Sequence, residues 1–236
     1  MKYYTSFLFA FVFLLGLSSC YDEPEFALEP YLVGFDGDNG IRFVDVPNTI
    51  ADSLIIRVEF QDGNGDLGLV SNESDPVLRE QYIFYLDDSG DYIRYNAEVD
   101  AVNGRLDCTK FAYFNVIGRD TIQDTIRVDI NPYYFNFDVG LYVKEDGEFQ
   151  EYDFLKELCR PRLGGRFTHL KEDFNNTKPL EGIIEYGIAS TGLVTLFRND
   201  TLKLTVKIRD RAKNESNVIE SRPFVLRSEG SIYADE

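Results

Sequence analysis

The chain has 236 residues and a formal net charge of −17, with 44% hydrophobic and 14% aromatic residues. A surface this acidic repels the phosphates of nucleic acids and of anionic lipids. We therefore exclude nucleic acid as a partner and exclude adsorption to a membrane by charge. The apolar content is ample for a packed core and argues against disorder. The same acidity favours divalent cations as ligands.

The N-terminus has the pattern of a secretory signal peptide. Lys2 precedes an uncharged apolar run over residues 7–17. This run is shorter than the about 20 residues that a membrane-spanning helix needs. It leads into LSSC at residues 17–20, which resembles a lipobox. We therefore predict that residues 1–19 are removed and that Cys20 carries a covalent lipid anchor.

Acidic residues follow the predicted anchor. YDEPE at residues 21–25 resembles the surface-export signal of Bacteroidetes lipoproteins, although Pro and Glu are equally typical of a plain solvated linker. With residues 20–30 as the linker, the prediction is an outer-membrane lipoprotein that faces the cell surface. The alternative is a location on the periplasmic face.

Apolar and polar residues alternate in four clear segments, which predicts half-buried strands. The segments cover residues 54–60, 126–130, 135–143 and 202–208. Turns rich in Gly, Asp and Asn separate them, and the best helical candidate is the short stretch 152–158. Many short strands joined by tight turns predict an all-β protein with antiparallel pairing.

The C-terminal hairpin indicates the architecture. A strand that runs to Arg209 is followed by a turn between Asp210 and Asn214, and a second strand resumes at Val218. This layout resembles the last hairpin of bacterial immunoglobulin-like domains. The predicted fold is therefore an immunoglobulin-like antiparallel β-sandwich.

The domain prediction follows from this hairpin. The sandwich covers residues 31–228, with hairpins inserted at about residues 96–178 and a tail at residues 229–236. Two sandwiches divided near residue 131 are the rival layout.

Three motifs together resemble a known group of proteins. FQDGNGDLG spans residues 60–68, NPYY spans residues 131–134, and DRAKNESN spans residues 210–217. In this order they resemble an uncharacterised family of Bacteroidetes outer-membrane lipoproteins. The likeness covers most of the chain after Cys20. It implies a fold and a location but no activity.

The loop after residue 61 has the pattern of a calcium site. Asp62, Asn64 and Asp66 alternate with glycines, and Glu73 falls at the twelfth position of such a loop. Leu67 stands where an EF-hand has glycine and the flanks are strands, so the loop resembles those of extracellular β-domains instead. We predict structural Ca²⁺ here; the alternative is an acidic hairpin turn without metal.

A second acidic cluster precedes this loop. DGDNG at residues 36–40 places Asp36 and Asp38 among glycines. This cluster is the weaker candidate for a calcium site. Three interpretations are open: a second calcium site, a contribution to the first site, or a turn without metal.

Cys108 and Cys159 are the two cysteines besides Cys20. Outside the cytoplasm such a pair bridges more often than not. The bridge would contribute about 4 kcal/mol by the chain-entropy argument. Two buried free thiols are the alternative.

The aromatic segment at residues 133–137 mixes core and surface positions. Alternation places Phe135 and Phe137 in the core and Tyr134 outward. Tyr133 and Tyr134 are therefore candidates for a contact surface.

Sequence motifs for catalysis are missing. His169 is the only histidine, and the chain has no nucleophile elbow, zinc-protease motif or phosphate-binding loop. A hydrolase with a pair of carboxylates is the least favoured function, because abundant acidic residues are no evidence for such a pair. We predict that the protein is not an enzyme.

The predicted function is a lipid-anchored, calcium-binding interaction module. It would serve as an accessory subunit of an outer-membrane protein complex for transport, secretion or assembly. The alternative is a surface lipoprotein that binds glycans with an exposed row of Tyr or Phe, although the chain has no Trp.

Overall fold

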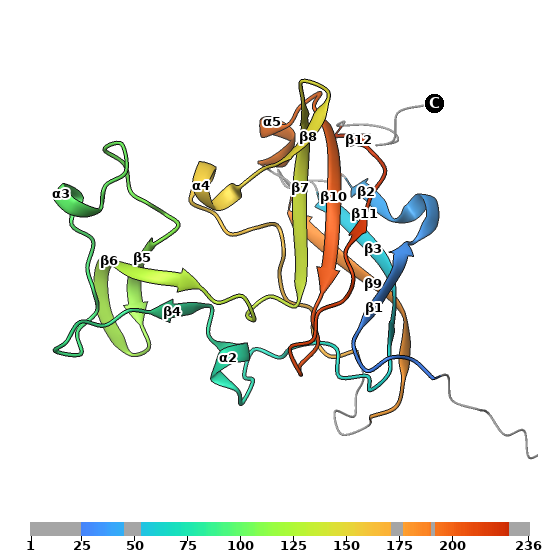
Figure 1. Cartoon of the computed structure of the whole chain (residues 1–236), viewed down its shortest axis with the longest axis horizontal. Helices are drawn as coiled ribbons and strands as arrows, with labels where there is room; N and C mark the ends of the chain where they lie inside the picture. The colour runs from blue at the N-terminus through green and yellow to red at the C-terminus, as the bar shows by residue number, and fades with distance from the viewer. Residues whose placement is uncertain (1–24, 45–52, 171–176, 190–191, 227–236) are drawn as a thin grey trace, which may run out of the picture.

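The computed structural model describes residues 25–44, 53–170, 177–189 and 192–226. The predicted signal peptide, Cys20 and the predicted tail at residues 229–236 lie outside these ranges. Two antiparallel sheets pack face to face, and a third, smaller sheet stands beside them (Figure 1). The prediction of an all-β sandwich is confirmed.

The first sheet is built around one long strand. Its members are β1 (Tyr31–Phe35), β2 (Ile41–Val44), β3 (Ser53–Asp62) and β9 (Leu180–Ala189). β9 pairs with the whole length of β3, so β1 and β2 follow one another along the other edge of β3. The 3-10 turn η1 (Gly37–Asn39) separates β1 from β2.

The second sheet covers the first. Its members are β7 (Phe137–Glu145), β8 (Glu148–Glu151), β10 (Thr201–Ile208), β11 (Ile219–Glu220) and β12 (Phe224–Val225). β10 pairs with β7 on one side and with β11 and β12 on the other, and β8 pairs with β7. Strict alternation on β3, β7 and β10 turns every second side chain inward, and these side chains form one core between the sheets.

Polar side chains of the C-terminal segment bond to the backbone of neighbouring strands. Asn217 accepts from the Leu32 backbone N–H at 2.8 Å and donates to the Leu32 carbonyl at 2.9 Å, which links the C-terminal segment to β1. Ser216 and Ser221 accept from the N–H groups of Ile208 and Leu204 on β10, at 3.0 and 2.9 Å. The residues after Asn214 in the DRAKNESN motif thus have a structural role.

The third sheet forms a separate lobe. It contains β4 (Tyr82–Phe84), β5 (Phe111–Ile117) and β6 (Asp120–Ile130), with β6 in the middle. We call residues 82–130, which also include the short helix α3 (Ala97–Asp100), the lobe; it lies at the left of Figure 1. Aromatic rings pack against each other within it, including Phe84 with Phe114 and Tyr95 with Phe111.

The lobe begins and ends earlier in the chain than the insertion predicted at residues 96–178. β7 and β8 fall inside that range but belong to the sandwich, because β7 pairs with β10 over residues 137–143 and β8 pairs with β7. The rival layout placed a division near residue 131, where the chain does pass from the lobe to the sandwich. The lobe is nevertheless a single three-stranded sheet rather than a second sandwich.

In the described part of the chain, four short helices lie outside the sheets: α2 (Pro76–Arg79), α3, α4 (Phe154–Leu158) and α5 (Leu193–Leu196). Asp153 caps α4 by accepting from the N–H groups of Leu155 and Lys156. Cys159 ends α4 in the left-handed region and forms a disulfide with Cys108 of the lobe, with a Cα–Cα distance of 5.2 Å. Within the described ranges no helix has the length and apolar character needed to cross a membrane.

Candidate functional site

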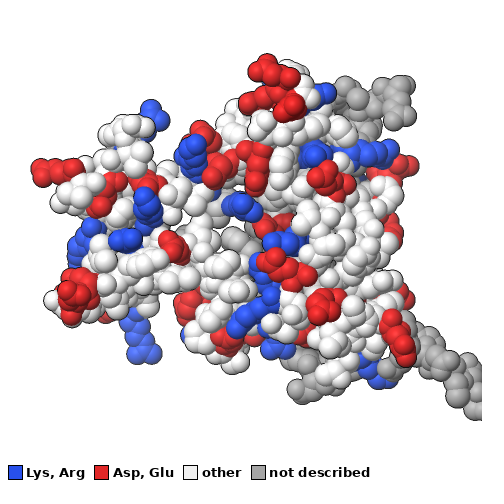
Figure 2. Space-filling view, in the orientation of Figure 1, with Lys and Arg blue, Asp and Glu red and all other residues white. Residues whose placement is uncertain are grey.

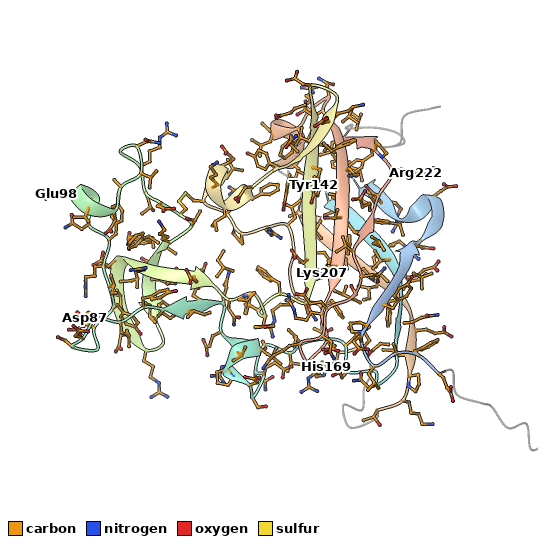
Figure 3. All side chains as sticks on the ribbon, in the orientation of Figure 1. Asp87, Glu98, Tyr142, His169, Lys207 and Arg222 are labelled. Atoms are coloured by element: carbon orange, nitrogen blue, oxygen red, sulfur yellow. A yellow bond between two sulfur atoms is a disulfide. The ribbon has the colours of Figure 1, made fainter. Side chains whose placement is uncertain are left out.

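The loop with the predicted calcium ligands lies at one end of the sandwich. It starts where β3 ends, and Leu67 forms an isolated bridge with Asp210 just beyond β10. Leu69 donates its N–H to the Phe167 carbonyl at 2.9 Å, which brings the segment with His169 alongside (Figure 3). We use the name acidic junction for the group Asp62, Asp66, Glu73, His169, Asp210 and Arg211.

Close packing accounts for two glycines of the loop. Gly63 donates its N–H to the Ala27 carbonyl at 2.8 Å, and a Cβ on Gly63 would lie 2.5 Å from the Phe26 carbonyl oxygen. Gly68 has a φ of +102°, and a Cβ there would lie 2.5 Å from the His169 Cα. The glycine spacing therefore has a cause in the fold, whether or not a cation binds.

Asp66 and Asp210 form an acidic pair at the centre of the junction. Asp66 is partly buried, and its Oδ1 atom is shielded from solvent and has no hydrogen-bond partner. Burial raises the pKa of Asp66 to about 6, and the nearby charge of Asp210 adds to this effect. Asp210 is buried, and burial also raises its pKa although it accepts hydrogen bonds from the Asn214 backbone and side-chain N–H groups at 2.8 Å. A bound proton or cation would reduce the electrostatic repulsion between the Asp66 and Asp210 carboxylates.

Glu73 is turned toward cationic and polar partners. It is buried, and its carboxylate accepts from the Val70 N–H at 3.0 Å and lies 3.4 Å from an Arg211 Nη2 atom. The His169 Nε2 atom lies 3.5 Å from Glu73 Oε1. Burial lowers the pKa of His169, the Arg211 charge lowers it further, and Glu73 opposes both effects. The net effect favours the neutral imidazole.

The four predicted ligands are not assembled around a common point. Asn64 uses its side-chain oxygen to accept from the Asp66 N–H at 3.2 Å, and Glu73 has the partners just described. Among the residues that the structure describes, no three acidic, His or Cys side chains form a group that could hold a metal ion. Calcium ligation by Asp62, Asn64, Asp66 and Glu73 stays a prediction.

Sequence reasoning missed Asp210 as a member of this site, although a signal was present. The buried positions of β10 recur every second residue from Leu202 to Ile208, and Asp210 is the next in this series. Asp62 continues the inward series of β3 in the same way. Both side chains are almost fully buried, at 0% exposed for Asp62 and 1% for Asp210. An acidic residue at an inward strand position is unusual and marks a site or a paired charge.

The second predicted acidic cluster is held by arginines instead. Asp36 accepts from Arg57 Nε at 2.7 Å, and Asp38 accepts from Arg222 Nη2 at 2.9 Å. These ion pairs connect the turn between β1 and β2 to β3 and to the segment between β11 and β12. The two carboxylates point to different partners and do not act together.

Tyr133 and Tyr134 lie beneath arginine side chains. The Arg209 guanidinium lies 5.2 Å from the Tyr133 ring centre, and that of Arg166 lies 4.7 Å from the Tyr134 ring centre. Arg166 also donates to the carbonyls of Val70, Leu78 and Tyr134. Both rings are half-buried and lie in the segment through which the chain passes from the lobe to the sandwich.

The raised pKa of Asp66 predicts an unusual pH dependence in the metal-free protein. Its folded pKa of about 6 exceeds the reference value of 3.8, so the folded state binds the proton more tightly. The contribution of Asp66 to stability should therefore rise as the pH falls from about 7.5 to about 4.5, whereas the lowered pKa of His169 acts in the opposite direction. Because Asp66 is only partly buried, we expect about 1 kcal/mol rather than the full effect. Urea unfolding with a chelator present, at several pH values, measures this.

Asp66→Asn is the matched variant for that experiment. Above pH 6 it should be about 1 kcal/mol more stable than the wild type, and this advantage should vanish at acid pH. Carboxyls with lowered pKa values, such as Asp75 beside Lys213, titrate below this window and affect both proteins alike. If the unfolding free energies of the two proteins changed with pH in parallel, Asp66 would have an ordinary pKa.

Comparison with known proteins gives no match for this chain among protein-family models, curated proteins or solved structures.

Proposed function

We propose that the protein is a lipid-anchored interaction module that docks onto a protein partner at the outer membrane through the tip of the lobe. One observation supports this most. The segment of α3 and the loop after it exposes three aliphatic side chains within eight residues: Val99 at 79%, Val102 at 52% and Leu106 at 38%. A contiguous exposed apolar patch marks a protein contact site, and our proposal is that these three side chains form one.

The tip is also fixed in place. Cys108 follows it directly, and the disulfide to Cys159 ties it to the end of α4. Asn96 caps α3 by accepting from the Glu98 N–H at 3.0 Å, and the Asp100 carboxylate accepts from the Asn96 N–H at 2.8 Å. A segment ordered before binding loses less entropy on docking, which favours affinity.

Site-specific photo-crosslinking in the native cell tests the docking tip. A crosslinking residue in place of Val102 should give a discrete product with a membrane protein, and the Cys20→Ala variant should lose it together with the anchor. Val218 is the matched control, because it is equally exposed at 57% but lies on the sandwich. Equal products from both positions, or none from Val102, would refute the docking surface.

We further propose that the acidic junction binds Ca²⁺ between Asp66 and Asp210. Two observations support this proposal. The Asp66 Oδ1 atom is shielded from solvent and has no hydrogen-bond partner, and the Asp66 and Asp210 carboxylates repel each other. Glu73 is not included, because Arg211 already compensates its charge. Backbone carbonyls and water would complete the shell of six to eight oxygens that Ca²⁺ takes.

Calorimetry with calcium tests this second proposal. The wild type should bind one ion and gain thermal stability, whereas Asp66→Asn should do neither. Glu73→Gln is the matched control in the same junction and should still bind. If millimolar calcium produces no heat and no thermal shift in the wild type, the junction is an acidic turn without metal.

The alternative of glycan binding on an aromatic row has less support. Among the described aromatic residues, Tyr31 and Tyr113 are more than half exposed, at 51% and 59%. Tyr31 lies on β1 and Tyr113 on β5, which belong to different sheets. These two rings do not form one platform.

A further inference from the structure

A cavity of about 430 Å³ opens between the lobe and the sandwich. Its walls come from three parts of the chain: the exit of β6, the outer face of β7 and β10, and the segment around α4. Figure 2 shows the molecule hollowed between the lobe and the sandwich. The volume falls in the range of small-molecule sites, which often occur where two units of a fold meet.

One part of the wall is apolar. It is formed by Ile130, Pro132, Phe135, Leu155 and Pro161. Phe135 was predicted to be a core residue, yet it is only partly buried and faces this cavity. A flat ring beside two prolines offers a surface for the C–H faces of a ligand.

The rest of the wall is charged, and each charge already has a partner. Lys207 pairs with Glu215 at 2.9 Å, and Arg209 also pairs with Glu215. Arg162 lies 3.6 Å from Asp138 and 3.4 Å from Glu151. The Asp153 carboxylate caps α4. A charged ligand would have to break one of these pairs, whereas a neutral one would not.

The position of this wall is covalently fixed. Cys159 lies only two residues before Pro161, and its disulfide to Cys108 anchors the segment to the lobe. The cavity is therefore largely formed before any ligand arrives, as is usual for small-molecule sites.

We infer that this cavity binds an uncharged polyhydroxy ligand, namely a mono- or disaccharide unit. Hydroxyl groups both donate and accept, so they can bond to Arg162 and Lys207 and to Asp138 and Asp153 without separating the ion pairs. The C–H faces of a sugar ring pack on Phe135 and the prolines. This inference is independent of the docking tip, because Val99, Val102 and Leu106 do not line the cavity.

Saturation-transfer NMR on the full mature protein tests the inference. The probes are glucose, galactose, mannose, N-acetylglucosamine, maltose and cellobiose at millimolar concentration, with citrate and dialanine as charged comparators. At least one neutral sugar should bind, and Leu155→Trp, which fills the cavity, should abolish binding. No binding of any sugar to the wild type, undiminished binding to Leu155→Trp, or stronger binding of citrate or dialanine would overturn the inference.

Two matched lysines on β10 provide a second test of sugar binding, and this test does not require that the cavity be filled. Lys207 and Lys203 lie on the same face of the strand, and each pairs with a glutamate at 2.9 Å (Figure 3 labels Lys207). Only Lys207 lines the cavity. Lys207→Met should weaken sugar binding about 5-fold, the effect of one lost hydrogen bond, and Lys203→Met should leave it unchanged. Equal effects of the two substitutions would contradict a site in this cavity.

Discussion

Replacing both Cys108 and Cys159 by serine should lower the free energy of unfolding by about 4 kcal/mol. The disulfide closes a loop with a sequence separation of 51 residues that contains β5, β6, β7 and β8. Its loss frees the unfolded chain more than the folded one, because Arg166 and Arg209 still hold the segments that flank the folded lobe. Urea unfolding of the oxidised wild type and the double variant measures the difference.

Reduction of the wild type is the control for this experiment. Reduced wild type and the double-serine variant should unfold at the same urea concentration, since both lack the bridge. Hydrogen exchange should show the largest loss of protection in the lobe, which has fewer contacts with the sandwich core. Identical stability of the oxidised wild type and the double variant would mean that the cysteines are not bridged in solution.

Polar side chains also hold the segments through which the chain enters and leaves the lobe. Asn131 donates to the carbonyls of Val77 and Glu80, both at 2.6 Å, at the point where the chain leaves the lobe. Arg209 donates to the carbonyls of Pro132 and Phe135 just after it. The NPYY motif thus lies where the chain crosses from the lobe to the sandwich, and polar contacts hold this crossing in place. The disulfide adds a covalent restraint on the opposite side of the cavity.

Much of the sandwich could be predicted from alternation alone. The patterns at residues 54–60 and 202–208 correspond to β3 and β10, because each of these strands is buried on one face only. The same logic extends to Asp62 and Asp210, which continue the inward series of their strands. Recognising them as buried acids requires only that the period be followed one step beyond the last apolar residue.

Long-range pairing could not be predicted in the same way. The predicted insertion includes β7, because nothing local in residues 137–145 indicates that β10, some sixty residues later, is its partner. The junction has the same difficulty: Glu73 matches the twelfth position of a calcium loop, but Arg211 and His169 approach it from distant parts of the chain. Spacing identifies candidate ligands, whereas the charges that compete for them are set by the tertiary fold.

Gly68→Ala should be among the most damaging single substitutions, with a loss of about 3 kcal/mol or more. Alanine at a φ of +102° is strained, and its Cβ would also lie 2.5 Å from the backbone of the His169 segment. Gly147→Ala in the hairpin between β7 and β8 is the matched control. Gly147 has a similar φ of +95°, but nothing lies within 4 Å of an added Cβ. This control should lose only about 1–2 kcal/mol for the backbone strain.

The difference between these two variants measures the contact alone. Urea unfolding in chelator should give midpoints that differ between Gly68→Ala and Gly147→Ala, with unchanged slopes. No metal is present in this experiment. A large difference between the two midpoints would therefore show that Gly68 is required because residues 167–170 pack closely against the loop. Equal losses would mean that the His169 segment moves aside at little cost. In that case the spacing of the motif would need another cause, and a cation at Asp66 and Asp210 would be the first candidate.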